Sequence, residues 1–398
     1  MRVANRVRRI YERRPYPPPK LRGARPPLPP IEWINAISEK SASDFPARIL
    51  VAGCGVGTEA FGLARWFPEA EVVGVDFSPR SIATARKLRR KADGGERVRF
   101  EVADITAPGL GKVAGSGFDL VSCHGVLSYV AEPVLALRNL AARLKPGGLL
   151  VLGVNGAAHP SARWRRELSG FGISPEEFRE SRRLREVLRA FESLSNSPLR
   201  MAEREAGYLA GDLFGPLNHA LTLEAWSDML RQSGLQLLGS YDAFFAIRPL
   251  LNRDLHSPLI PRSRADVAEL VDSLHPATFH QLVLSRRRPV KIPWSNGRKL
   301  MRLRPALTGL YRIRWPGRSG SWHGLRSVRL ESEATGTKVN LRVPRWEVEL
   351  LRGSDGERSL GDLLRAVKPS VSTESFREAM FLLYHLGLIN LLRARQGR

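Results

Sequence analysis

The sequence predicts an α/β protein, namely a Rossmann-like, doubly wound sheet of seven strands followed by a small C-terminal winged-helix-like α+β module. Short apolar runs alternate with amphipathic segments from Arg48 to Asn155, as in parallel sheets with helices on both faces. A glycine-rich loop at residues 53–57 separates the first such run from the segment that follows it. The chain has 398 residues, which exceeds the usual size of one domain.

Each element of the sheet follows from this alternation. An apolar run of four to eight residues bounded by turn residues predicts a strand, and a longer amphipathic segment predicts a helix. A helix is also expected near residues 31–41, before the first strand. The expected strands are 48–52, 71–76, 98–103, 118–123, 149–154, 235–240 and 278–285, and the helices among them are 58–67, 79–91, 133–144 and 223–233.

The predicted boundaries divide the chain into four parts. Residues 1–30 form a basic, proline-rich N-terminal arm, and 31–285 form the main domain. Within this domain, residues 156–222 are expected to form a helical insert over the active site, because residues 160–206 are rich in Arg and Glu, as in exposed helices. Residues 286–343 are predicted to be a basic linker and 344–398 the accessory module, with helices at 344–351, 359–367 and 373–386 and a strand at 388–392.

The net charge of +24 is concentrated in two segments. Residues 1–30 contain nine Lys/Arg and one acid, and residues 281–330 contain thirteen Lys/Arg and no acid. Such segments usually face an anionic partner, here RNA or an acidic surface. Two alternatives remain open: an arginine-rich composition typical of GC-rich genomes, or pairing with acids of the 156–222 insert.

Several classes of protein are disfavoured by composition. No apolar run is long enough for a transmembrane helix, and the basic N-terminus lacks the features of a secretory signal. Two cysteines, Cys54 and Cys123, are too few for a disulfide framework or a zinc site. We therefore expect a cytoplasmic protein with free thiols and no metal.

The most informative stretch is ARILVAGCGVGTEA, in which a strand ends at Ala52 and Gly53, Gly55 and Gly57 follow. Glycines allow a tight turn and let a ligand lie against the backbone. A pyrophosphate is typically bound by G-x-G-x-x-G, so the G-x-G-x-G spacing disfavours a nucleotide-dependent dehydrogenase. It suits S-adenosylmethionine (SAM), which has no phosphate.

Acidic residues end the next two strands. Asp76 stands nineteen residues after Gly57, at a strand tip where a carboxylate can accept both ribose hydroxyls of an adenosine. Alternatively, Asp76 caps the next helix, which Pro79 opens. Phe77 would lie beside the adenine or pack in the core. Asp104 ends the third strand, where it can accept from the adenine amino group.

This ordered set resembles the class I SAM-dependent methyltransferase family from Arg48 to Asn155. One departure is Val51, since the family usually has an acid two residues before the first glycine; main-chain carbonyls or Glu59 would substitute. The motif Tyr11-Glu12…Pro15-Tyr16-Pro17 is similar to the N-terminal signature of a bacterial subgroup with a C-terminal accessory module. The resemblance implies SAM as cofactor, lined by Gly53, Gly55 and Gly57, with Asp76 at the ribose and Asp104 and Ile105 at the adenine. The neighbouring residues Cys54, Phe77 and His124 complete the predicted cofactor site.

The acceptor side is expected after the fourth strand and in the insert. His124 and Tyr129 follow that strand, and Asp212 with His219 could form a proton relay above the pocket. Their alternatives are a structural histidine and a capped turn. The fourth strand ends in Cys-His-Gly-Val instead of Asp/Asn-Pro-Pro-aromatic, which argues against adenine or glutamine nitrogens as acceptors.

These observations favour SAM-dependent methyl transfer to a protein or peptide, or to a small metabolite. RNA is an alternative acceptor because of the two basic segments. A catalytically inactive SAM-binding regulator is a second alternative because of Val51.

Overall fold

The computed structural model describes residues 2–13, 27–40, 44–170, 182–195, 201–204, 206–246, 263–288, 291–317, 321, 324–333, 336–367 and 371–393. Its contacts divide the chain into two compact units. The first unit contains residues 1–28, 46–237 and 272–288, and the second contains 29–45, 238–271 and 289–398. Both units are therefore assembled from three separate segments of the chain.

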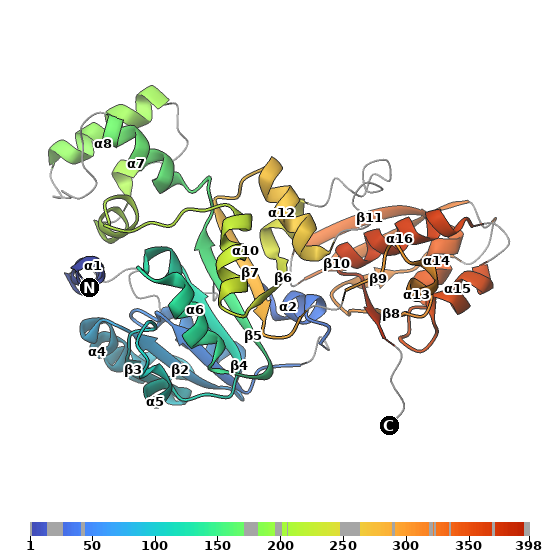
Figure 1. Ribbon diagram of the computed structural model, residues 1–398, viewed down its shortest axis with the longest axis horizontal. Coiled ribbons are helices and arrows are strands. Elements are labelled where there is room, and N and C mark those ends of the chain that lie inside the picture. The colour runs from blue at the N-terminus through green and yellow to red at the C-terminus, as the bar shows by residue number, and fades with distance from the viewer. Residues whose placement is uncertain are drawn as a thin grey trace. The chain divides into compact units, whose positions relative to one another are not determined.

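A seven-stranded sheet confirms the predicted Rossmann-like fold (Figure 1). The strand order is β3-β2-β1-β4-β5-β7-β6. The first five strands pair in parallel, and β7 runs antiparallel to β5. The strands are β1 (Arg48–Ala52), β2 (Glu71–Asp76), β3 (Val98–Val102), β4 (Phe118–His124), β5 (Leu144–Asn155), β6 (Gln236–Ser240) and β7 (Phe279–Ser285).

The order of the strands reverses between β1 and β4, and ligands of doubly wound sheets bind beyond the carboxyl ends of strands at such a point. Helices that connect successive strands flank the sheet (Figure 1). They are α3 (Thr58–Trp66), α4 (Pro79–Leu88), α5 (Leu110–Ala114), α6 (Pro133–Ala141) and α10 (Leu223–Gln232). Three short 3-10 turns, η1 (Arg89–Lys91), η2 (Gly95–Arg97) and η3 (Leu127–Tyr129), accompany them.

The start of the predicted arm is helical. Residues Arg2–Arg13 form α1, in which Arg8 and Glu12 make an i,i+4 ion pair of 3.0 Å. The helix contacts α4, where Arg80 Nη1 donates to the carbonyl of Glu12 at 3.1 Å. Prolines begin only at Pro15, so nothing in residues 2–13 prevents a helix. Residues 14–26, which include Tyr16, lie outside the described residues.

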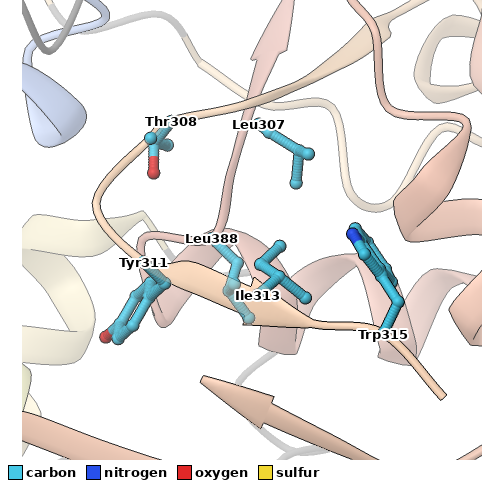
Figure 2. Close-up of a pocket in the computed structure, with 7 residues that line it drawn as sticks. Leu307, Thr308, Tyr311, Ile313, Trp315 and Leu388 are labelled. Carbon is cyan, nitrogen blue, oxygen red and sulfur yellow. The ribbon is translucent and has the colours of Figure 1, made fainter. Parts of the chain in front are cut away.

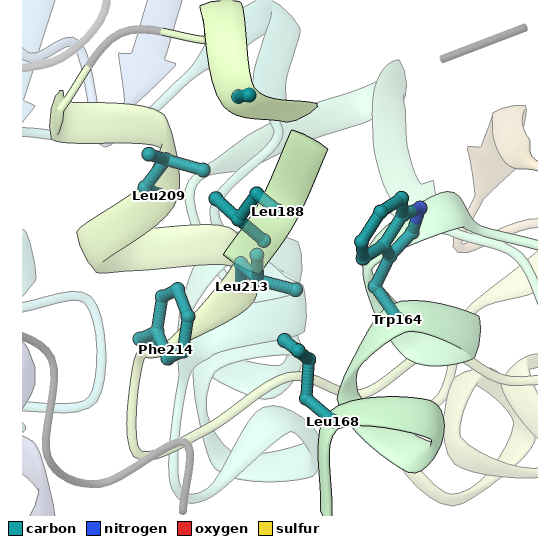
Figure 3. Close-up of a cluster of buried hydrophobic side chains, with 7 residues drawn as sticks. Trp164, Leu168, Leu188, Leu209, Leu213 and Phe214 are labelled. Atoms are coloured by element: carbon teal, nitrogen blue, oxygen red, sulfur yellow. The ribbon is translucent and has the colours of Figure 1, made fainter. Parts of the chain in front are cut away.

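The insert has its own hydrophobic core, whereas the sequence suggests exposed helices. It contains α7 (Pro160–Gly170), α8 (Arg182–Ser195), η5 (Met201–Glu203), α9 (Ala206–Tyr208) and the π-helical turn η6 (Leu209–Leu213). Burial of large apolar side chains stabilises such a cluster by about 1.5–3 kcal/mol each. The buried cluster comprises Trp164, Leu168, Leu188, Ala202, Leu209, Leu213 and Phe214 (Figure 3).

The second unit contains two small antiparallel sheets, with strand orders β11-β10-β9 and β12-β8. Its strands are β8 (Arg304–Leu307), β9 (Arg312–Arg314), β10 (Leu325–Ser332), β11 (Thr337–Pro344) and β12 (Ile389–Leu392). Its helices are α2 (Ile31–Ile37), α11 (Tyr241–Ala246), α13 (Gly297–Leu300), α14 (Arg345–Arg352), α15 (Leu360–Val367) and α16 (Thr373–His385), and α12 (Arg264–Leu274) begins in it.

The segment 286–343 differs from the predicted linker, because β8 to β11 lie within it or extend from it. Val328 and Leu330 of β10 are buried, and Arg329 between them is exposed, as in a strand with one covered face. The high density of arginine concealed this alternation. Trp294 is also buried, with its ring 5.3 Å from that of Phe381 on α16. Residues 289–343, 29–45 and 238–271 therefore belong to the same unit as the C-terminal helices.

Candidate cofactor and acceptor site

The end of β2 holds the glycine loop that follows β1. The carbonyl of Val75 accepts from the amides of Gly53 and Cys54 at 2.8 and 2.9 Å. Asp76 Oδ2 accepts from the amide of Gly55 at 2.9 Å. The φ angles at Gly53, Gly55 and Gly57 are 75°, 52° and 91°, in the left-handed region that glycine adopts readily.

Two of these glycines are required by packing within the protein. A Cβ on Gly53 would lie 2.3 Å from Val126 Cγ2, and one on Gly57 would lie 2.7 Å from Phe100 Cζ. Any larger residue at either position would therefore displace the loop or its neighbours. Cys54 between them is a buried free thiol, and burial raises its pKa, so it stays neutral.

Asp76 lies at the tip of β2, and its side chain is almost fully buried. Its Oδ1 accepts from the amide of Ser78 at 2.9 Å. The helix cap itself is Ser78, whose Oγ accepts from the amide of Ser81 at 3.2 Å. Burial raises the pKa of Asp76. Each carboxylate oxygen retains a lone pair for a further donor such as a hydroxyl.

The residues predicted beside the adenine follow the ends of β2 and β3, which are parallel neighbours. Phe77 is half-buried, and its ring centroid lies 6.5 Å from that of Tyr11 on α1. Asp104 is exposed and accepts from Thr106 N at 2.8 Å and Thr106 Oγ1 at 2.7 Å. Ile105 is buried. These positions share one edge of the sheet with Asp76.

Glu59 brings a carboxylate to the sheet beside Val51. Ser122 of β4 is the register partner of Val51, and its hydroxyl donates to Glu59 Oε1. Burial raises the pKa of Glu59 to about 7. Across the part of the chain that is described, no cation pairs with this carboxylate. A carboxylate from α3 therefore lies beside Val51, the β1 position at which the resemblance leads us to expect an acid.

His124 ends β4 opposite Gly153 of β5. A Cβ on Gly153 would lie 2.4 Å from His124 Nδ1, so the ring occupies the space above this glycine. It also lies 5.0 Å from the ring of Phe279. Burial lowers the pKa of His124 to about 4, which keeps the ring neutral. This environment fits a packing role.

Tyr129 and Asp212 meet in a buried polar network. Tyr129 lies on η3 after β4, and its hydroxyl donates to Asp212 Oδ1 on the π-helical turn of the insert. Asn155, the last residue of β5, donates from Nδ2 to the Tyr129 hydroxyl at 2.9 Å. Two of the predicted acceptor-side residues are thus brought into direct contact.

Further polar residues extend this network into the insert. Asn218 accepts from Asn155 at 2.9 Å and donates to Ser161 Oγ at 2.6 Å. Ser161 Oγ also lies 2.6 Å from His159 Nδ1. His219 lies apart from Asp212, because its Nε2 bonds to the carbonyl of Val130 at 2.9 Å. The geometry joins Asp212 to Tyr129 instead of to His219.

Tyr129 and Asp212 lose their protons in different pH ranges. Burial raises the pKa of Asp212 to about 6, while the Tyr129 hydrogen bond and Arg204 act in the opposite direction. Burial and the nearby Asp212 charge raise the pKa of Tyr129. The phenol therefore stays protonated, and the carboxylate changes charge near pH 6.

Tyr11 of α1 lies between Phe77 and the π-helical turn η6 of the insert. Its ring faces Phe77, and a Cβ on Gly211 would lie 2.8 Å from its hydroxyl. Gly211 belongs to the same π-helical turn as Asp212. The absence of a side chain there allows Tyr11 to approach.

Sequence reasoning missed Asn155 and Asn218. A polar residue at the end of the buried run of β5 was a usable signal for Asn155, because strand ends at this edge bind ligands. Asn218 had no local signal, since its place depends on how the insert folds.

Comparisons with known proteins point to a methyltransferase domain in this chain. Residues 50–150 match the methyltransferase domain family. The chain is 30% identical over 153 residues to an uncharacterised protein of Synechococcus sp., covering 37% of this chain and 36% of that protein. It is 31% identical over 122 residues to the ubiquinone biosynthesis O-methyltransferase of Xanthomonas axonopodis pv. citri, covering 31% and 47%. The chain thus spans less than half the length of these relatives.

The solved structure of PKMT2 from Rickettsia typhi in complex with AdoHcy is similar to this chain, with a TM-score of 0.52 and 15% identity. The similarity covers 96% of this chain and 78% of that one, and it shows the fold. The sheet and its glycine loop are those of a Rossmann-like domain, and residues 50–150 match a methyltransferase domain. This match supports SAM as the cofactor.

In the described part of the chain, no helix is long and apolar enough to cross a membrane. The same residues contain no cluster of three His, Cys, Asp or Glu side chains suitable for a metal ion.

Proposed function

We propose that the protein is a SAM-dependent methyltransferase in which the β1–α3 loop and Asp76 hold the adenosine part of SAM. The observation that carries this proposal is the Gly55 amide bonded to a buried Asp76, which presents the loop and the ribose-binding carboxylate together. Phe77, Asp104 and Ile105 would contact the adenine. Gly53, Cys54 and Gly57 would line the cofactor through their backbone, and His124 would pack beside it.

Glu59 would bind the methionine ammonium of SAM. Its carboxylate accepts from Ser122, and burial raises its pKa to about 7. An ion pair with the ammonium would offset the cost of burying this charge. Glu59 would therefore supply the carboxylate that Val51 lacks, which argues against a catalytically inactive regulator.

The acceptor would be a protein or peptide, or a small metabolite, held at the Tyr129–Asp212 pair. Asp212 could remove a proton from the nucleophile, and Tyr129 and Asn155 would orient it. His219 would hold the loop after η3 through Val130. The similar enzyme from Xanthomonas is named for ubiquinone biosynthesis, which favours a small acceptor, whereas the basic segments favour a macromolecule.

The deciding experiment has two arms. Isothermal titration should detect SAM and not NAD, and Gly55→Val should abolish SAM binding. Gly234→Val is the matched control, because Gly234 also has a left-handed φ, of 79°, but no atom lies near its Cβ position. Incubation of lysate with tritiated SAM, with and without protease or RNase, then identifies the class of acceptor. A protein that binds SAM but labels nothing would be the regulator.

The basic segments 1–30 and 281–330 are proposed to contact an anionic partner, RNA or an acidic surface. Their 22 Lys/Arg face only one acid within the segments themselves. Binding through several charges should weaken steeply as salt is raised. A cytoplasmic location is part of the same proposal and rests on the two free, buried cysteines.

A further inference from the structure

A cavity of about 230 Å³ opens in the second unit between β8, β9 and the loop that joins them (Figure 2). Its side chains are mainly apolar, and two of them, Leu307 and Trp315, are 39% and 38% exposed. Ordinary small-molecule sites measure roughly 300–1,000 Å³, so this cavity is better matched to one bulky side chain of a partner. The walls include Leu307, Tyr311, Ile313, Trp315 and Leu388.

The cavity adjoins a strand edge. In the three-stranded sheet β11-β10-β9, β9 is the last strand, and it pairs with β10 through Ile313–Leu330 and Arg314–Arg329. No strand pairs with its other edge among the residues that the structure describes. Such an edge can accept an extended peptide as an additional strand.

The two faces of β9 differ in chemistry. Successive side chains of a strand point to opposite faces. Ile313, together with Tyr311 and Trp315 on either side, lines the cavity, and Arg312 and Arg314 point to the other face. Their side chains are 72% and 62% exposed, and their nearest acids lie 3.8 and 3.6 Å away in loose pairs.

Basic residues continue across that second face. Arg329 lies opposite Arg314 in the register, and Lys338 and Arg342 lie on β11. Among the residues of these three strands, Glu331 is the one acid, and it lies on this face. Exposed pairs of this kind contribute little, so the arginines can exchange partners at small cost.

We propose that β9 binds an extended acidic peptide as a fourth strand, with one bulky apolar side chain in the cavity. The residues before and after that side chain would point to the other face and pair with Arg312 and Arg314. The two-residue period of a peptide strand fits this alternation, whereas RNA has no such period. Arg352 already covers the Trp315 ring at 5.3 Å, which disfavours base stacking there.

The acidic peptide is a specific form of the anionic partner proposed above for residues 281–330. Its binding does not depend on methyl transfer. The test uses the full chain and a fluorescein-labelled Asp-Glu-Phe-Glu-Asp peptide, with binding followed by anisotropy at low salt. Trp315→Ala should weaken binding about tenfold or more, because it removes a wall of the cavity that would hold the anchor side chain of the peptide. The double variant Arg312→Ser/Arg314→Ser should do the same. A peptide with Ser in place of Phe should bind equally weakly to the wild type.

The matched control is the double variant Lys338→Ser/Arg342→Ser, which removes the same charge from the far strand of the same sheet. It should change peptide affinity less than twofold. An equal loss in both double variants, with heterologous RNA competing fully, would assign the face to polyanions in general. Equal binding of the Phe and Ser peptides, or no binding at low salt, would overturn the proposal. SAM affinity measured on the same variants should be unchanged, which separates this proposal from that of methyl transfer.

Discussion

Glu59 carries a charge that opposes folding until a cation reaches it. Its pKa in the folded protein is about 7, above the ordinary value of 4.5. A raised pKa means that the folded state holds the proton more tightly than the unfolded state. The stability that this proton provides is fully present below about pH 4.5 and is lost as the pH rises through about 7.

We therefore expect Glu59 to make the free energy of unfolding fall, and the SAM affinity rise, over the same pH interval. Without SAM, Glu59→Gln should flatten the decline in unfolding free energy between about pH 4.5 and 7. SAM affinity should rise over this interval in the wild type, because the ammonium requires the ionised carboxylate, and should be flat and lower in Glu59→Gln. Denaturation and calorimetry over this range measure the two trends. A wild-type pH profile of SAM affinity retained by the variant would exclude Glu59 from the cofactor site.

Asp212 is the residue whose loss should separate catalysis from cofactor binding. Removal of a general base costs about 10²–10⁴-fold in rate. Asp212→Asn keeps the size of the side chain and should lower methyl transfer by that order while leaving SAM affinity unchanged. In the wild type, transfer should fall as the pH drops through about 6, where burial places the Asp212 pKa. An unchanged rate in Asp212→Asn would assign the pair a structural role.

At the level of elements, the turn from β2 into α4 contains two polar side chains with different roles. Ser78 caps the helix, and Asp76 holds the Gly55 amide. Loss of an N-cap costs about 0.5–2 kcal/mol, so Ser78→Ala should lower stability by that amount and spare SAM affinity. Asp76→Ala should weaken SAM binding by about 1.5–3 kcal/mol, the range for hydrogen bonds to a charged group.

Chemical denaturation and SAM titration on both variants measure these effects. Asp76 also supports the loop, so some loss of stability is expected in Asp76→Ala. A variant that loses stability alone, with SAM affinity intact, would contradict the assignment of Asp76 to the ribose.

The elements of the sheet could be predicted because parallel strands are buried on both faces and appear as apolar runs such as RILVA in β1. The conformation of the glycine loop was equally accessible, since Gly53, Gly55 and Gly57 all adopt positive φ. β10 and β11 were missed because one of their faces carries arginine and lysine. The Tyr129–Asp212 contact joins residues 83 positions apart, so no local pattern could identify it.

At the scale of the whole molecule, the C-terminal helices share a unit with residues 29–45 and 238–271. Within this unit α2 contacts β12, and the Arg264 guanidinium lies 3.8 Å from the ring of Tyr384. Truncation after Ser285 would expose the apolar surfaces that these contacts cover. We expect the truncated protein to melt at a lower temperature and to aggregate.

Light scattering and thermal denaturation of the truncated and full-length chains measure this outcome. Co-expression of residues 286–398 as a separate fragment should restore part of the stability, because α2 can pack on β12 and Arg264 on Tyr384 in trans. A monodisperse truncated protein with the SAM affinity of the full chain would show that residues 286–398 fold and act independently.

The three-segment composition of the second unit also has a consequence for synthesis on the ribosome. Trp33 and Ile34 of α2 leave the ribosome early, yet β12, which α2 contacts in the finished unit, comes last. Translation at roughly 5–20 residues per second puts tens of seconds between them. During that interval the nascent chain carries apolar side chains whose final neighbours do not yet exist. The folding yield should therefore depend on translation speed and on chaperones that shield these side chains.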